Sequence, residues 1–331
     1  DIPFWSMIPA ITEPGEDREA LTSLARTCSG IGDAIPTVLT MTIVPILSAS
    51  SAIADYRIGF RWWALIVVVV FVISELICVL KVPEKPIETT APTSSVGQMF
   101  RTLFANDQAM TVVVSIILVY TSVNICGNLV LYFFQFDVGN EGAYSIFAAV
   151  AFAAQVLVMM IVPALRKKFT KAQLFVFGFL IQIVGFLVIL AKAFGGVYTP
   201  ENWYILCIPG IMIYLGYGML NVIMTIFLSD SVDYGEVKNH TREESVIFSM
   251  QTFTVKLASG LAVFLAGIVV DLIHLETDAA VQSAGTLTQL RMWMTIPSVL
   301  LLIVGIIVFK KCYKLDDAKM DEIKKTLEER K

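Results

Sequence analysis

Side chains that bind metals or carry out acid–base chemistry are scarce in this sequence. It has two histidines, and its five cysteines are scattered without a Cys-x-x-Cys pair. Neither set has the spacing of a metal site or a disulfide framework. Charged residues make up only 16% of the chain and are concentrated in the connecting segments and the tail. We therefore expect no metal and no nucleic-acid partner, and the composition gives no indication of a cofactor or of an enzymatic function.

Apolar residues are abundant instead. They account for 56% of the 331 residues, and the mean hydropathy is +0.75, well outside the range of soluble globular proteins. A membrane-spanning helix needs roughly 20 mostly apolar residues. A partial span is predicted at 1–11, and full spans at 21–48, 60–80, 108–134, 143–165, 172–194, 203–229, 246–273 and 289–309. The sequence predicts an all-α, polytopic protein of the lipid bilayer.

The chain begins with Asp1 in an apolar run that lacks the basic and small-residue flanks of a signal peptide. We expect residue 1 to lie within a helix whose first half is missing. The alternative is a mature N-terminus exposed by processing.

The polar segment 82–107 is rich in Pro, Glu, Thr and Ser, and it is long enough to join two helical bundles. The predicted organisation is a bundle remnant at 1–81, a linker at 82–107, a six-helix bundle at 108–310 and a tail at 311–331. Lysine and arginine are concentrated in the connector 166–171 and in the tail, which predicts that both are cytoplasmic. The tail also has helical apolar spacing, typical of an amphipathic helix on the bundle or membrane surface, or of a partner-binding module.

Lys256 stands inside the otherwise apolar run 246–270, after a charged segment at 229–238 that we interpret as a loop. A cation near the middle of a bilayer costs about 2.5 to 3.5 kcal/mol, so it is tolerated mainly in a bundle interior or a wet cavity. Ser249, Thr252, Lys256 and Ser259 share one helix face. This polar stripe indicates the lining of a pathway.

Three segments resemble one family: residues 1–9, 230–238 and 242–256. They are similar to the glycoside-pentoside-hexuronide:cation symporters, the melibiose-type sugar carriers of the major facilitator superfamily. The resemblance extends over essentially the whole chain. It implies twelve helices in two six-helix bundles, of which about the first three and a half are absent, so that the sequence begins within helix four.

The resemblance also implies a sugar site. Asp1 and Trp5 match an aspartate and a tryptophan that contact the sugar, and Arg26 matches the sugar-contacting arginine. Lys256 resembles a lysine between the sugar and the cation site, so Asp1 and Lys256 are also expected in cation coupling. The expected sugar-binding set is Asp1, Trp5, Arg26, Asp33, Asn124, Asn128, Asn221, Gln251, Thr252 and Lys256.

Several members of this set carry alternatives. For Asp1 the alternative is a purely structural ion pair, and for Trp5 it is an interfacial anchor near the cytoplasmic end. Asp33 has no family counterpart, and it either compensates Arg26 or alters sugar preference. Asn124 and Asn128 follow Tyr120 at intervals of four, and such amides either bridge helices or face a cavity. Asn221 stands where melibiose-type carriers have a tryptophan, which weakens the case for an α-galactoside.

A cytoplasmic gate is expected from Arg18, Glu19, Asp230, Asp233 and Arg242, which resemble charges that pair across the two bundles. The alternative is that these charges are merely solvated.

The expected function is symport of a glycoside or oligosaccharide with Na+, H+ or Li+ across the plasma membrane by alternating access, with the C-terminus cytoplasmic. The alternatives are a related lysolipid carrier, a membrane-embedded enzyme acting on a lipid-linked sugar, and an inactive partial carrier.

Overall fold

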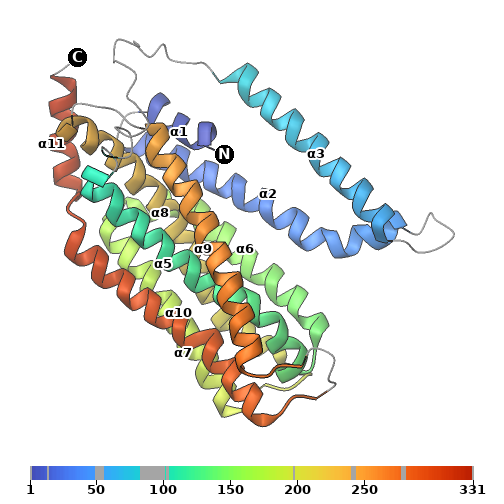
Figure 1. Ribbon diagram of the computed structural model, residues 1–331. Helices are drawn as coiled ribbons and strands as arrows, with labels where there is room; N and C mark the ends of the chain where they lie inside the picture. The colour runs from blue at the N-terminus through green and yellow to red at the C-terminus, as the bar shows by residue number, and fades with distance from the viewer. Residues whose placement is uncertain are drawn as a thin grey trace. The chain divides into compact units, whose positions relative to one another are not determined.

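The computed structural model describes residues 2–12, 15–48, 56–82, 101, 104–196, 198–239, 244–276 and 281–329. Within these ranges the chain is helical and has no β-strand, as the all-α prediction requires (Figure 1). The helices are α1 (Ile2–Ile11), α2 (Glu16–Ser48), α3 (Tyr56–Lys81), α5 (Asp107–Tyr132), α6 (Glu141–Arg166), α7 (Lys171–Gly195), α8 (Cys207–Asn239), α9 (Glu244–Leu272), α10 (Ala284–Cys312) and α11 (Asp317–Glu328). A π-helical segment (Phe133–Val138) continues α5, and a 3-10 turn (Trp203–Leu206) precedes α8.

Seven helices in the described part of the chain are long and apolar enough to cross a membrane. They are Arg57–Lys81, Asp107–Val138, Gly142–Arg166, Lys171–Gly195, Trp203–Asn239, Val246–Leu272 and Ala284–Cys312. Each coincides with one of the seven spans predicted from residue 60 onward. Some side chains of α2 lie outside the described residues, so the span at 21–48 stays a prediction.

One boundary prediction was wrong. The charged segment 229–238 is not a loop, because α8 continues as one helix to Asn239. Asp230 and Asp233 are buried on this helix, at 3% and 1% exposure. Burial of a carboxylate is tolerated when a cation pairs with it, and both aspartates have such partners. Ion pairs with other helices therefore stabilise the part of α8 that extends beyond the apolar span, and the sequence pattern does not reveal these pairs.

The chain divides into two compact units, residues 1–27 with 90–331, and residues 28–89. In the first unit α8 is the central helix and contacts α5, α6 and α7. α10 packs against α5 and α7, and α9 packs against α1 and α5. The predicted division at 82–107 stays a prediction, and most of that segment lies outside the described residues.

The second unit contains the rest of α2 together with α3. The two helices approach closely at Gly59, where an added Cβ would lie 2.2 Å from the Val44 carbonyl oxygen. Trp63 Nε1 donates a hydrogen bond of 2.8 Å to Thr40 Oγ1. Glycine at 59 and this side-chain contact therefore join the pair.

The connector between α6 and α7 is fixed by a capping box. Thr170 Oγ1 accepts from the Gln173 backbone N–H at 3.2 Å, and Gln173 Oε1 accepts from the Thr170 N–H at 3.0 Å. The connector is only four residues long, so Arg166 at the end of α6 and Lys171 at the start of α7 lie at the same end of the bundle.

α11 packs on the end of α8 through its apolar face. Leu315, Met320 and Ile323 form a small cluster against Tyr234 and Val237. The amphipathic tail helix expected from the sequence is therefore present, and its apolar face is covered by the bundle.

Candidate functional site

Arg26 on α2 is held between an aromatic ring and a hydroxyl group. Its Cζ lies 3.9 Å from the ring centroid of Trp5 on α1, within cation–π range. Its Nε donates a 2.7 Å hydrogen bond to Thr225 Oγ1 on α8. Trp5 is 8% exposed and Thr225 is fully buried. The structure thus brings together two of the predicted sugar-binding residues, Trp5 and Arg26.

Asn221 lies one turn from Thr225 on α8, and the chain itself satisfies its amide. Its Oδ1 accepts a hydrogen bond from Tyr120 on α5, and its Nδ2 donates to the Tyr217 carbonyl at 2.9 Å. The rings of Tyr120 and Tyr217 meet edge to face at 5.4 Å. Asn221 is therefore fixed in the α5–α8 interface, and a direct sugar contact by it stays a prediction.

Asn124 and Asn128 are half-buried on α5, and their amide nitrogens bond back to their own helix. Asn124 Nδ2 donates to the Tyr120 carbonyl and Asn128 Nδ2 to the Asn124 carbonyl, each at 2.7 Å. Among the residues that the structure describes, neither amide nitrogen bonds to another helix. Their predicted place in a cavity stays open.

The predicted residues of α9 lie on two faces. Gln251 is buried at 5% exposure, and its Oε1 has no hydrogen-bond partner among the described residues. Thr252 is half-buried and donates to the Phe248 carbonyl at 3.2 Å. Lys256 is exposed, away from the buried alanines Ala258 and Ala262. The polar stripe therefore lies outside the packed core, and its role as a pathway lining stays a prediction.

Three predicted residues do not join these groups. Asp1 and Arg242 lie outside the described residues. Asp33 belongs to the second unit, where its side chain is exposed. Their predicted roles stay predictions.

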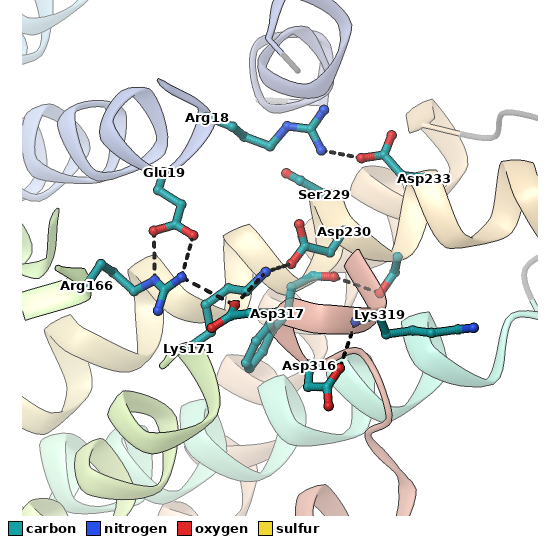
Figure 2. Close-up of polar contacts among 12 residues, drawn as sticks. Arg18, Glu19, Arg166, Lys171, Ser229, Asp230, Asp233, Asp316, Asp317 and Lys319 are labelled. Atoms are coloured by element: carbon teal, nitrogen blue, oxygen red, sulfur yellow. Dashed lines mark hydrogen bonds and ion pairs between the residues drawn. The ribbon is translucent and has the colours of Figure 1, made fainter. Parts of the chain in front are cut away.

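A charge cluster lies at the end of the bundle where α6 meets α7, and Figure 2 shows its side chains. Its members are Arg18, Glu19, Arg166, Lys171, Asp230, Asp233 and Asp317. Arg18 pairs with Asp233 of α8, and both side chains are almost completely buried. Arg18 also donates to Thr12, through Nη2 to the carbonyl at 2.8 Å and through Nε to the hydroxyl at 3.4 Å. Every nitrogen of the Arg18 guanidinium is therefore bonded.

The other half of the charge cluster joins five helices, α2, α6, α7, α8 and α11 (Figure 2). Arg166 holds Glu19 by two hydrogen bonds of 2.7 and 3.0 Å, and Lys171 Nζ lies 2.6 Å from Asp230. Asp317 of α11 stands between these pairs, 3.3 Å from Arg166 and 3.6 Å from Lys171. A cavity of about 470 Å³ lies beside the charge cluster. Four of the five predicted gate residues are thus in ion pairs: Arg18 and Asp233 with each other, Glu19 with Arg166 and Asp230 with Lys171.

A family model described as MFS/sugar transport protein matches residues 1–317. The chain belongs to this family. Its resemblance to major facilitator sugar carriers and its fold class are therefore confirmed, and membership places it among multi-pass membrane transport proteins rather than enzymes.

Curated relatives of the chain are named as carriers, permeases or transporters. The raffinose carrier protein of Pediococcus pentosaceus is 26% identical over 99% of this chain and 51% of its own length. The lactose permease of Leuconostoc lactis is 24% identical over 98% of this chain and 50% of its own length. The isoprimeverose transporter of Lactiplantibacillus pentosus is 24% identical over 94% of this chain and 64% of its own length. The chain spans about half the length of the first curated relatives it matches.

Thr225 was not identified from the sequence as the hydrogen-bond partner of Arg26. Thr225 is weakly polar and lies in an apolar run, so composition does not mark it. The spacing held a signal, because Tyr217, Asn221, Thr225, Ser229 and Asp233 recur every four residues along α8. This pattern places one polar stripe along the helix.

Arg166, Lys171 and Asp317 were also missed as members of the charge cluster. The sequence used the two cations only to orient the chain in the membrane. Arg166 pairs with Glu19, and Lys171 pairs with Asp230. These pairs depend on the packing of α2, α6, α7, α8 and α11 against one another, which the sequence does not reveal.

A further ion pair lies in the π-helical segment that continues α5, and its carboxylate is buried. Arg291 of α10 holds Asp137 by two hydrogen bonds of 2.7 and 2.6 Å, and Tyr198 donates to Asp137 at 2.6 Å. Burial, followed by the hydrogen bond to Asp137, raises the pKa of Tyr198 well above its ordinary value. Tyr198 therefore stays a neutral donor, and this group joins α5 to α10 within one bundle.

Proposed function

We propose that the gene product containing these residues is a secondary carrier of the plasma membrane that moves a glycoside or oligosaccharide inward with Na+, H+ or Li+. The observation that carries the proposal is the Arg26 guanidinium over the Trp5 ring. Sugar recognition needs directed donors for hydroxyl groups beside an aromatic surface. Arg26 and Trp5 place both kinds of group at one point in a helical bundle.

Family membership and the relatives' names support the substrate class. Three relatives are named for raffinose, lactose and isoprimeverose, all of which are glycosides. A lysolipid carrier is the second candidate. It needs a lateral apolar opening and a headgroup site, and the polar residues Trp5, Arg26 and Gln251 favour a sugar over it.

The coupling mechanism we propose is thermodynamic linkage. A cation bound near Asp1 and Lys256 improves sugar affinity, and sugar improves cation affinity by the same factor. Lys256 is exposed on α9, so a ligand or another segment can approach it. No covalent bond is made or broken in this cycle.

Alternating access also needs an end that closes and opens. We assign this role to the charge cluster, which ties α2 to α6 and α8 through Arg166–Glu19 and Arg18–Asp233. By the distribution of lysine and arginine, this end faces the cytoplasm together with the C-terminus. Ion pairs that form in one state and break in the other bias the carrier toward an outward-open state.

Uptake into proteoliposomes tests the proposal. The product of the whole gene, reconstituted and given raffinose, lactose, isoprimeverose or melibiose, should accumulate at least one of them under an inward Na+, H+ or Li+ gradient. Arg26→Gln should abolish uptake because it removes the guanidinium donors. Lys311→Gln, which removes an exposed cation at the end of α10, should leave uptake unchanged.

Transport of a lysophospholipid with no uptake of any of the four glycosides would replace this proposal with the lysolipid carrier. Equal uptake by wild type and Arg26→Gln would remove Arg26 from the site.

A further inference from the structure

Two arginines of α2 reach α8 in one regular register. Arg18 pairs with Asp233, and Arg26 donates to Thr225. Arg26 lies eight residues after Arg18, and Thr225 lies eight residues before Asp233. Eight residues make about 2.2 helical turns, so the two arginines lie on the same side of α2, and Thr225 and Asp233 lie on the same side of α8. The first turns of α2 and the end of α8 therefore face each other in antiparallel order.

The midpoint of this register also carries polar groups. Thr22 lies halfway between Arg18 and Arg26, and Ser229 halfway between Asp233 and Thr225. Both are fully buried. Thr22 Oγ1 has no hydrogen-bond partner among the described residues, whereas Ser229 donates to the Thr225 carbonyl at 3.1 Å. The facing surfaces are thus polar between the two arginines as well as at them.

The two arginines differ in what remains free. All three nitrogens of Arg18 are bonded, and its charge is met by a carboxylate. Arg26 uses only Nε, its acceptor is a neutral hydroxyl, and Nη1 and Nη2 have no hydrogen-bond partner among the described residues. A guanidinium is planar. The hydrogen bond from Nε and the contact with the Trp5 ring fix its plane, so they also fix the direction of the two terminal nitrogens. Arg18 therefore has no nitrogen left for a ligand, whereas Arg26 has two oriented terminal nitrogens that can donate to one.

Thr225 is itself held in place. Its hydroxyl donates to the Asn221 carbonyl at 2.9 Å, which turns its lone pairs toward Arg26. Asn221 is fixed in turn by Tyr120 and by the Tyr217 carbonyl. The orientation of Arg26 therefore depends on a threonine hydroxyl that is held by a backbone carbonyl of its own helix, α8.

We propose that Thr225 is a positioning residue that aligns the Arg26 guanidinium on Trp5, so that its two terminal nitrogens donate to paired hydroxyl or ring oxygens of a glycoside. This inference rests on the proposed function and adds to it a residue that need not touch the sugar. A neutral acceptor suits the role, because a carboxylate at this position would bind Arg26 as Asp233 binds Arg18.

A double-mutant cycle tests whether Thr225 acts through Arg26. In the whole-gene product, Thr225→Val keeps the shape of the side chain and removes the hydroxyl. Loss of a hydrogen bond to a charged group should weaken equilibrium sugar binding roughly tenfold or more, and Thr225→Ser should restore it. In an Arg26→Lys background, Thr225→Val should have almost no further effect, because the guanidinium it aligns is gone.

Thr295→Val is the matched control. Thr295 is also fully buried and bonds to the carbonyl four residues before it, on α10, but its hydroxyl bonds to no arginine side chain among the described residues. Its sugar affinity should match wild type. Thr225→Ala provides a second hydroxyl-free variant if Thr225→Val fails to insert.

A second measurement needs no sugar. In a whole-gene product in which every tryptophan other than Trp5 is replaced by phenylalanine, Trp5 emission reports the guanidinium above its ring. Thr225→Val should shift this emission and Thr225→Ser should not. Unchanged emission and unchanged affinity in Thr225→Val, or equal losses in the wild-type and Arg26→Lys backgrounds, would overturn the inference. A protein that binds no glycoside but shows the emission shift would instead remove the proposed function and keep Thr225 as the residue that orients Arg26.

Discussion

At the residue scale, buried polar groups differ in whether the chain supplies a partner. Arg18 and Asp233 are a closed pair with almost no exposure. Gln182 on α7 is also completely buried, yet neither Nε2 nor Oε1 has a hydrogen-bond partner among the described residues. These two cases predict opposite responses to removal of a polar group.

Asp233→Ala should destabilise the protein strongly. It leaves the Arg18 guanidinium buried without a counter-charge, which costs about 3 to 5 kcal/mol in comparable pairs. Denaturant unfolding in detergent measures the loss. Arg18→Met combined with Asp233→Ala should recover part of it, and Asp321→Ala, at an exposed position of α11, should change little. A double variant less stable than Asp233→Ala would contradict the pairing.

Gln182→Leu should stabilise the protein, by about 1 to 3 kcal/mol, because it removes a buried amide that has lost its hydrogen bonds to solvent. Gln108→Leu is the contrasting variant. Gln108 is equally buried, but it accepts from the Lys314 N–H at 2.8 Å and donates to Asp107 at 2.6 Å, so its removal should destabilise. The same unfolding assay decides the sign, and a destabilised Gln182→Leu would mean that its amide has a partner.

Trp5 and Arg26 were expected in a sugar site because they match residues of the melibiose-type carriers that the sequence resembles, and Asn221 because it stands where those carriers have a tryptophan. The sequence did not identify what they contact. Asn221 was interpreted as a sugar ligand, yet its amide is used by Tyr120 and Tyr217. Pairing depends on which helices become neighbours, and helix periodicity fixes only the face within one helix.

At the element scale, α8 and α11 depend on each other. α8 extends past its apolar span to Asn239, and its last turns present Tyr234 and Val237 to the apolar face of α11. Apolar spacing predicted the span, but the extra turns depend on ion pairs and on the tail helix. For the same reason, the charged segment was misread as a loop.

Ile323→Ala should loosen α11 from the bundle. Ile323 is 3% exposed, and truncating a buried isoleucine costs about 2 to 5 kcal/mol. Hydrogen exchange of the 317–328 amides should become faster, while exchange in α7 stays unchanged. Glu322→Ala, at an exposed position of the same helix, should leave exchange near wild type. Unchanged exchange in Ile323→Ala would show that the apolar cluster does not hold the tail.

At the scale of the whole molecule, composition and apolar periodicity predicted an all-helical membrane protein, and seven predicted spans have helices in the structure. These features follow from local sequence, since each span must be apolar over its own length. The grouping of residues 1–27 with the later helices did not follow. It depends on long-range contacts such as Arg26–Thr225.

Membrane orientation follows from the lysine and arginine distribution and is testable by labelling. In a cysteine-free variant, Val281→Cys should react with an impermeant maleimide added to intact cells, because one predicted span separates the segment 275–288 from the cytoplasmic tail and alternation places that segment outside. Glu329→Cys should react only after permeabilisation. The reverse pattern would invert the topology and place the charge cluster outside.

The central claim, a cation-coupled sugar carrier, is tested most directly by reciprocal flux in proteoliposomes made with the whole-gene product. An outside sugar pulse with no cation gradient should drive Na+, H+ or Li+ inward, and an inward gradient of that same cation should drive sugar accumulation, since linkage acts equally in both directions. Arg26→Gln should lose both fluxes. Sugar entry that moves no cation, and is indifferent to all three gradients, would contradict the account.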